Sequence, residues 1–343
     1  MVKRNPHSIV VIGGRRFDTW RDKQLVKHVE VELATDMSSQ ATVTLFDPRF
    51  RILDSFTSGD GVPQMTMLFY MGFGEELGPP VFKGLLARVE YGDAATTFVA
   101  YDMGLKMKQQ LKTEYHQGIN DLQILRKLAT RNGLRFEGPD ESPALEKHAS
   151  LIHPSKNDWE HSMERKRASG FVIFVRQDTL FCKRPAKISA PILTLRYRKD
   201  FEFVPALFGF SLQYKLPENQ QGRPKKVNVY GRKRGGRRLR GESSSHSRGH
   251  HPVKITRDPA EHTKLYVNTR AHAHKELQRE PSFNVRIKSI SPLPGVRPDV
   301  RNTIALENVG RLFSGPYLCD KVIHTHSPGE LHAEYNLYRD IAA

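Results

Sequence analysis

The first third of the chain alternates between hydrophobic and polar residues with a period of two. Residues 29–33 read Val-Glu-Val-Glu-Leu, and residues 65–71 carry Met, Met, Phe and Met at every second position. Such alternation places one face of a strand in a core and the other in solvent, as in antiparallel sheets. With glycine and proline between these segments, the pattern over residues 1–105 predicts a small antiparallel β-barrel.

The period changes to that of an amphipathic helix in the middle of the chain. Asn120 is a good N-cap, and Gly133 is placed to end the helix in the left-handed conformation. The same order recurs with Asn157 and Gly170, which are also thirteen residues apart, and an apolar strand follows each glycine. Residues 106–188 are therefore predicted to form a duplicated domain of two helix–glycine–strand units.

Alternating segments return after residue 189 and continue to the C-terminus. The tripeptide from Phe313 to Gly315 precedes two strands there, as the tripeptide from Phe82 to Gly84 does in the first third. This repetition predicts a second antiparallel barrel on the plan of the first. The predicted fold class is α+β and mainly β, with two small antiparallel β-barrel domains, 1–105 and 189–343, flanking the duplicated helix–strand domain, 106–188.

Composition adds a strong positive charge to this picture. The 343 residues include 54 Lys and Arg but 37 Asp and Glu, which gives a formal net charge of +17 and favours acidic partners. No apolar run approaches the roughly 20 residues of a membrane helix. The N-terminus lacks the apolar segment of a signal peptide, and two cysteines cannot form a disulfide framework. We therefore expect a soluble protein of a reducing cytoplasm, without membrane insertion.

A basic insert at residues 223–254 interrupts the predicted second barrel. It holds eleven Lys and Arg against one acid, Glu242, and its Gly and Ser residues predict a loop in which only residues 227–230 are strand-like. Such a loop could bind an acidic protein, or it could contact the phosphates of DNA without sequence specificity. The residues predicted to make either contact are Arg232, Lys233, Arg234, Arg237, Arg238 and Arg240.

Motifs for catalysis or metal binding are missing from the sequence. It contains no Gly-x-Ser-x-Gly elbow, no phosphate-binding loop and no His-Glu-x-x-His pair. The pair His324 and His326 would share a face of a strand, but no third ligand has suitable spacing. The sequence therefore predicts no catalytic residue, no metal site and no cofactor.

Three stretches carry a family resemblance that spans nearly the whole chain. The first runs from Met71 through the Phe82–Gly84 tripeptide to Asp102, the second from Asn157 to Leu180, and the third from Phe313 to Arg339. In this order they resemble the late control protein D family of contractile-tailed phages. Members of that family are baseplate hubs, related to the T4-type hub and to the hub part of type VI secretion spikes.

One helix departs from the family pattern. Relatives usually carry apolar residues where this chain has His161, Ser162, Arg165 and Lys166. The departure predicts that this helix is more exposed to solvent here than in its relatives.

The resemblance implies a structural protein of the virion and no enzyme activity. Hubs of this kind form a trimeric ring that joins the hexameric tail tube to the central spike, and two similar barrels per chain would present six similar units. The expected partners are further copies of the chain, the tube or a tube-initiator protein, the spike, and other baseplate proteins such as the tape measure. The expected location is the tail baseplate, after assembly in the cytoplasm of the host.

Two other functions stay open from the residues alone. The first is a basic DNA-binding protein that uses the insert at 223–254, although no helix-turn-helix or zinc-finger motif surrounds it. The second, less favoured, is a cell-wall hydrolase, which the missing catalytic motifs argue against.

Overall fold

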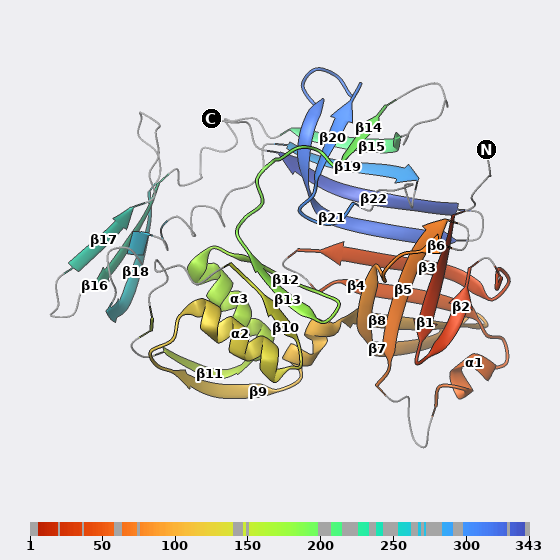
Figure 1. Ribbon diagram of the computed structural model, residues 1–343, viewed down its shortest axis with the longest axis horizontal. Coiled ribbons are helices and arrows are strands. Elements are labelled where there is room, and N and C mark those ends of the chain that lie inside the picture. The colour runs from red at the N-terminus through yellow and green to blue at the C-terminus, as the bar shows by residue number, and fades with distance from the viewer. Residues whose placement is uncertain are drawn as a thin grey trace.

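A computed structural model shows a chain built mainly of strands (Figure 1). The residues that it describes are 6–19, 21–35, 38–57, 64–73, 76–139, 147–148, 151–197, 207–214, 226–232, 238–242, 253–261, 267–268, 271, 283–290, 298–327 and 330–339. No helix within these stretches is both long enough and apolar enough to cross a bilayer.

A sheet of fourteen strands forms the larger part of the molecule. Eight strands and the short helix α1 (Arg51–Asp54) come from the first third: β1 (Pro6–Ile12), β2 (Arg15–Asp18), β3 (Val26–Ala34), β4 (Gln40–Phe46), β5 (Thr66–Phe73), β6 (Glu76–Leu77), β7 (Phe82–Gly92) and β8 (Ala95–Asp102). Six come from the last third: β14 (Leu193–Arg196), β15 (Leu207–Tyr214), β19 (Phe283–Ile290), β20 (Thr303–Glu307), β21 (Gly315–Ser327) and β22 (Glu330–Arg339).

The two thirds are joined edge to edge within this sheet. Its main path runs β15-β19-β22-β21-β3-β4-β8-β7-β5-β1-β2, and every neighbouring pair along it is antiparallel. Strands β21 and β3 pair from Lys321 opposite Ala34 to His326 opposite Val29. Because β3 bonds to β21, its edge is not available to close the first third on itself.

The predicted class, α+β and mainly β, is confirmed, but the two closed barrels are not found. Across the described strands the hydrogen-bonded path stays open, with β15 and β2 at its ends. A single hydrophobic core joins both thirds, and Val31, Phe69 and Phe98 pack in it together with Ile287 and Tyr335. The alternation of residues correctly predicted strands, but it could not say which strand pairs with which.

The middle of the chain has a second hydrophobic core. Its elements are the 3-10 helix η1 (Met103–Lys108), β9 (Leu111–His116), α2 (Asp121–Arg131), β10 (Arg135–Glu137), β11 (Leu151–Asn157), α3 (Asp158–Ser169), β12 (Val172–Arg176) and β13 (Thr179–Lys183). Strands β9 and β11 form one small antiparallel sheet, and β10, β13 and β12 form another. Helix α3 contacts both β11 and β12, and α2 contacts β10 and β13 (Figure 1). The repeated unit is therefore strand–helix–strand, one strand longer than the unit predicted from the sequence.

Local hydrogen bonds begin and end the two helices in parallel ways. The Asn120 side chain accepts from the Gln123 backbone N–H, and the Gln123 side chain accepts in return from the Asn120 backbone N–H. Asn157 and Glu160 form the same capping box at α3. Gly133 (φ 68°) and Gly170 (φ 75°) follow the two helices in the left-handed region that favours glycine.

The predicted solvent exposure of α3 is wrong. His161, Ser162, Arg165 and Lys166 are all buried, with 0–9% of their surface exposed. Two of them have polar partners: Ser162 Oγ donates to the Asp158 carbonyl at 2.8 Å, and Arg165 Nη1 donates to Asp121 Oδ1 at 3.3 Å. The polar residues on α3 thus form part of a buried polar cluster.

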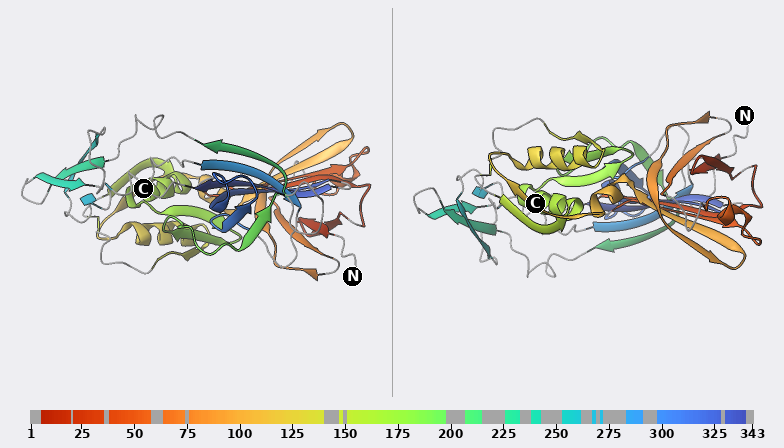
Figure 2. Two further views of the ribbon diagram at one scale, coloured as in Figure 1. Left: turned by 90° about the horizontal axis from the view of Figure 1, so that it is seen from above. Right: turned by 90° about the horizontal axis from the view of Figure 1, so that it is seen from below.

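The basic insert is not the loop that its composition predicted. It contains β16 (Lys226–Arg232), β17 (Arg238–Glu242) and the start of β18 (Val253–Glu261), which form a three-stranded sheet at one end of the molecule (Figures 1 and 2). Val227 and Val229 alternate along β16, and branched side chains favour strands whatever the charge around them. By sequence only residues 227–230 are strand-like, because the density of charge predicts a loop for the rest.

The left-handed position of Gly133 gives a test of this fold. A Cβ atom there would meet only Lys106 Nζ, at 3.9 Å, so the cost of a side chain would come from backbone strain alone. We expect Gly133→Val to lower the free energy of unfolding by about 1–2 kcal/mol, measured by urea denaturation. The control is Gly92→Val, at the end of a strand where nothing lies within 4 Å of the new Cβ. Equal stability of the two variants would contradict the helix-ending role of Gly133.

Candidate functional site

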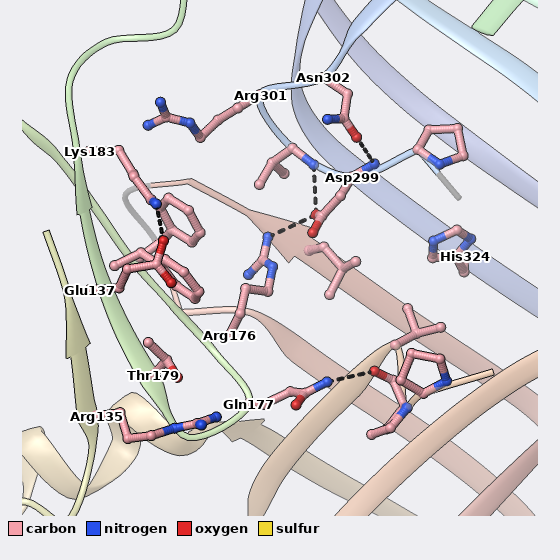
Figure 3. A pocket seen from close by; sticks show the side chains of 18 of the residues that line it. Arg135, Glu137, Arg176, Gln177, Thr179, Lys183, Asp299, Arg301, Asn302 and His324 are labelled. Atoms are coloured by element: carbon pink, nitrogen blue, oxygen red, sulfur yellow. Dashed lines mark hydrogen bonds and ion pairs between the residues drawn. The ribbon is translucent and has the colours of Figure 1, made fainter. Parts of the chain in front are cut away.

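A cavity of about 960 Å³ lies where the three thirds of the chain meet (Figure 3). The middle third contributes β10, β12, β13 and the β12–β13 turn, the first third contributes Leu33, Met71 and residues 79–81, and the last third contributes residues 298–302, His324 and Tyr335. Concave sites between parts of a fold are common places for binding. We therefore take this cleft as the candidate site.

Arg176 connects all three parts across the cleft. It is the last residue of β12, and its side chain is 13% exposed. Nη1 donates to Ser39 Oγ at 2.7 Å, while Nη2 donates to the Ala34 carbonyl at 3.4 Å and pairs with Asp299 Oδ1 at 3.3 Å. One guanidinium group therefore bonds to the first third and the last third from a strand of the middle third.

Asp102 supports this network through the loop that carries Ser39. Its carboxylate accepts from the Ser39 backbone N–H at 2.5 Å and from the Gly104 backbone N–H at 2.9 Å, so it fixes the loop that presents Ser39 to Arg176. Burial raises the pKa of Asp102 to about 6, against the lowering effect of these two hydrogen bonds and of the nearby Arg176 and Lys108 charges.

Three further polar side chains of the cleft also make contacts between segments. Lys183 forms an ion pair with Glu137, and Gln177 Nε2 donates to the Pro80 carbonyl at 3.1 Å (Figure 3). Arg301 Nη2 donates to the Arg184 carbonyl at 2.8 Å. Both acidic residues of the lining, Glu137 and Asp299, pair with cations, so these ion pairs hold segments of the chain together across the cleft.

The two Phe-x-Gly tripeptides are not in the cleft lining: residues 82–84 begin β7, whereas residues 313–314 precede β21 and only Gly315 belongs to it. A Cβ on Gly84 would come within 2.2 Å of the Tyr101 carbonyl oxygen and 2.5 Å of the Phe82 ring, so only glycine fits between β7 and β8 there. Gly315 has φ 130°, and a Cβ on it would lie 2.5 Å from the guanidinium of Arg339. The two tripeptides therefore need glycine for different reasons.

The described basic residues of the insert are not among those that line the cleft. On β17, Arg240 is exposed and is paired with Tyr230 of β16, and Arg238 is paired with Arg232 of β16. Lys233, Arg234 and Arg237 fall outside the described residues. The described members of this group thus do not belong to the cleft.

The central residues of the cleft have no signal in the sequence. Arg176 reads as an ordinary polar residue before a turn, and its partners lie 123 and 137 residues away in the chain. Of the predicted histidine pair, His324 lines the cleft, whereas His326 bonds to Ser8 through Nδ1 at 2.7 Å. Burial lowers the pKa of His326 to about 4, so it is neutral at physiological pH.

Comparison with solved structures shows that phage tail proteins share this fold. The tail protein from Neisseria meningitidis MC58 has a TM-score of 0.72 at 12% identity, covering 98% of this chain and 97% of that one. The 43 kDa tail protein of prophage MuSo2 from Shewanella oneidensis has a TM-score of 0.69 at 11% identity, covering 98% of both chains. The E. coli c3393 protein, a component of the type VI secretion system, has a TM-score of 0.54 at 9% identity, covering 92% of this chain and 74% of that one.

Comparison of sequences gives a different kind of match. Residues 7–206, more than half of the chain, match the family model described as the Alg8 N-terminal domain. No curated protein matches the chain.

Replacing Arg176 tests the joint between the three parts. Arg176→Met keeps a long side chain but removes every donor, and we expect it to lower the free energy of unfolding by about 1–3 kcal/mol. Arg135→Met is the matched control, because Arg135 lines the same cleft but is exposed. The measurement is chemical denaturation, and an equal loss in both variants would show that Arg176 is not a joint.

The raised pKa of Asp102 can be tested through the pH dependence of stability. Its pKa is about 6 in the folded protein and near 3.8 in the unfolded chain, so its protonation stabilises the fold fully below about pH 4. That contribution is lost as the pH rises through 6. We expect the stability of the wild type, relative to Asp102→Asn, to fall by about 2–3 kcal/mol between pH 4 and pH 7. Parallel pH profiles of the two proteins would contradict this pKa.

Proposed function

The chain belongs to the family described as the Alg8 N-terminal domain, and we propose that it is a structural protein of a phage tail baseplate. The observation that carries the proposal is a shared fold. Solved phage tail proteins match 98% of this chain, and the match covers nearly all of their own length. The cleft agrees with a structural role, because its charged groups bond segments of the chain to one another.

Within that role we propose a hub of the late control protein D type. Such a protein would form a homotrimer that joins the tail tube, or a tube-initiator protein, to the central spike. The likeness to a type VI secretion component whose structure is described as similar to the T4 tail proteins gp27 and gp5 supports this choice. The protein would then reside in the virion, at the tail baseplate, with other baseplate proteins around it.

An apolar face on the middle third supports contact with another subunit. Leu111 and Tyr115 point outward from β9, with 68% and 56% of their surface exposed, and Ile152, paired with Tyr115 on β11, is 62% exposed. Three large apolar side chains on one exposed face are typical of a surface that a partner covers. We propose that a second copy of the chain covers this β9–β11 face.

The basic insert supports a further contact, with an acidic partner. Its sheet lies at the end of the molecule beyond the middle third (Figure 2), and Arg240 is exposed there. We propose an acidic surface of another baseplate protein as the partner. A shift of duplex DNA by the isolated chain, lost with rising salt, would favour the DNA-binding alternative instead.

Assembly tests the hub proposal. We expect the wild type to sediment as a trimer, alone or with the spike protein, with more than about 1,000 Å² buried per interface. Replacing both Tyr115 and Ile152 by Glu should leave the circular dichroism spectrum unchanged but abolish the trimer, because charge would be buried in the contact. Leu312→Glu is the control, since Leu312 is 52% exposed outside the β9–β11 face.

Two results would contradict parts of this proposal. A chain that stays monomeric both in solution and inside an assembled baseplate would exclude the trimer. A trimer that survives the double substitution would exclude the β9–β11 face as its interface. Electron microscopy of tails labelled on this chain would test the baseplate location independently of either result.

A further inference from the structure

Three potential metal ligands converge between β9 and α3. Glu114 and His116 are two residues apart on β9, so their side chains share the face that turns toward the helices. His161 lies in the first turns of α3, on its buried side. Within the described residues, this is the group of His, Cys, Asp and Glu side chains whose ligand atoms come together, all within 4.8 Å of one another.

The distances in this group approach those of a coordination site. Zn²⁺ bonds to His nitrogen and carboxylate oxygen at about 2.0–2.2 Å, so tetrahedral ligands lie roughly 3.4 Å apart. His116 Nε2 and Glu114 Oε2 are already 3.3 Å apart. The ring centres of His116 and His161 are 5.1 Å apart, inclined by 42°. His161 is therefore the ligand that has to approach, by rotation of one side chain.

From this geometry we propose that Glu114, His116 and His161 bind a divalent transition-metal ion of the zinc type. Two imidazoles and one carboxylate are a ligand set that Zn²⁺ accepts, with a water molecule in the fourth position. The same set is poor for Mg²⁺ and Ca²⁺, which prefer oxygen ligands alone.

The charges around the group permit a cation. Arg131 forms ion pairs with Glu114 and with Asp158, and Arg165 pairs with Asp121 at 3.3 Å. Asp158 and Asp121 therefore offset the charges of Arg131 and Arg165, and the Oε2 atom of Glu114 faces His116. Lys127 also contributes positive charge near His116.

A bound ion would tie β9 to α3, because two of its ligands lie on the strand and the third lies on the helix.

Zinc titration of the full-length chain tests this inference. After removal of metals with EDTA and exchange into metal-free buffer, Zn²⁺ should raise the melting temperature and bind at one site in calorimetry. His116→Gln and His161→Gln should each weaken that binding by at least about tenfold, since even outer partners of a metal contribute that much. The control is His28→Gln, which should leave Zn²⁺ binding unchanged. His28 and Glu30 are also a histidine and a glutamate two residues apart on a strand, with His28 Nε2 and Glu30 Oε2 3.9 Å apart.

Cobalt supplies a readout that does not depend on the folding of variants. Co²⁺ bound to the wild type should give the intense visible bands of tetrahedral coordination, and Zn²⁺ should displace it. Zn²⁺ binding that is equal in the wild type and in both Gln variants would overturn the proposal, because other histidines would then be the ligands. A wild type with neither the cobalt bands nor a thermal shift would overturn it as well.

Discussion

The antiparallel pairing of β3 with β21 is the constraint on which the other contacts depend. Residues about 290 apart in sequence exchange backbone hydrogen bonds along this seam, and the strands on either side then share one core. The seam continues past the end of β3, where Thr35 Oγ1 donates to Oδ1 of Asp320 in β21 at 2.6 Å. Closing so long a loop costs chain entropy, so the shared core has to compensate for it. Neither third buries its hydrophobic face without the other.

The Arg176 joint is possible only because this seam exists. Ala34 ends β3 opposite Lys321, and Asp299 belongs to the last third, so the seam brings both into reach of one guanidinium. A buried cation is costly unless its donors are satisfied, and here Nη1 and Nη2 of Arg176 meet a carbonyl, a hydroxyl and a carboxylate. The middle third is thus positioned by polar contacts against a sheet that is itself held by apolar packing.

The sequence predicted what is local and missed what is distant. Capped helices, their closing glycines and most strands depend on neighbouring residues, and these signals were sufficient. The partner of β3, and with it the open sheet, depends on residues far along the chain, so alternation alone suggested closed barrels instead. Arg176 and Asp299 carry no motif, and the burial of His161 and Arg165 depends on partners from other elements. The candidate site was therefore beyond sequence reasoning, although its surroundings were not.

Strand β9 is a further case that alternation alone does not predict, because its polar face is buried and its apolar face is exposed. Glu114 and His116 face the helices, whereas Leu111 and Tyr115 face solvent. Period-two alternation says that a strand has two different faces, but the usual assumption that the apolar face is the inner one fails here. A buried polar face is stable only where its groups find partners, which Arg131 and the converging histidines supply. An exposed apolar face is stable in an assembly only when another molecule covers it. The inversion therefore links the two proposals for this strand: its inner face suits an ion, and its outer face suits a neighbouring subunit.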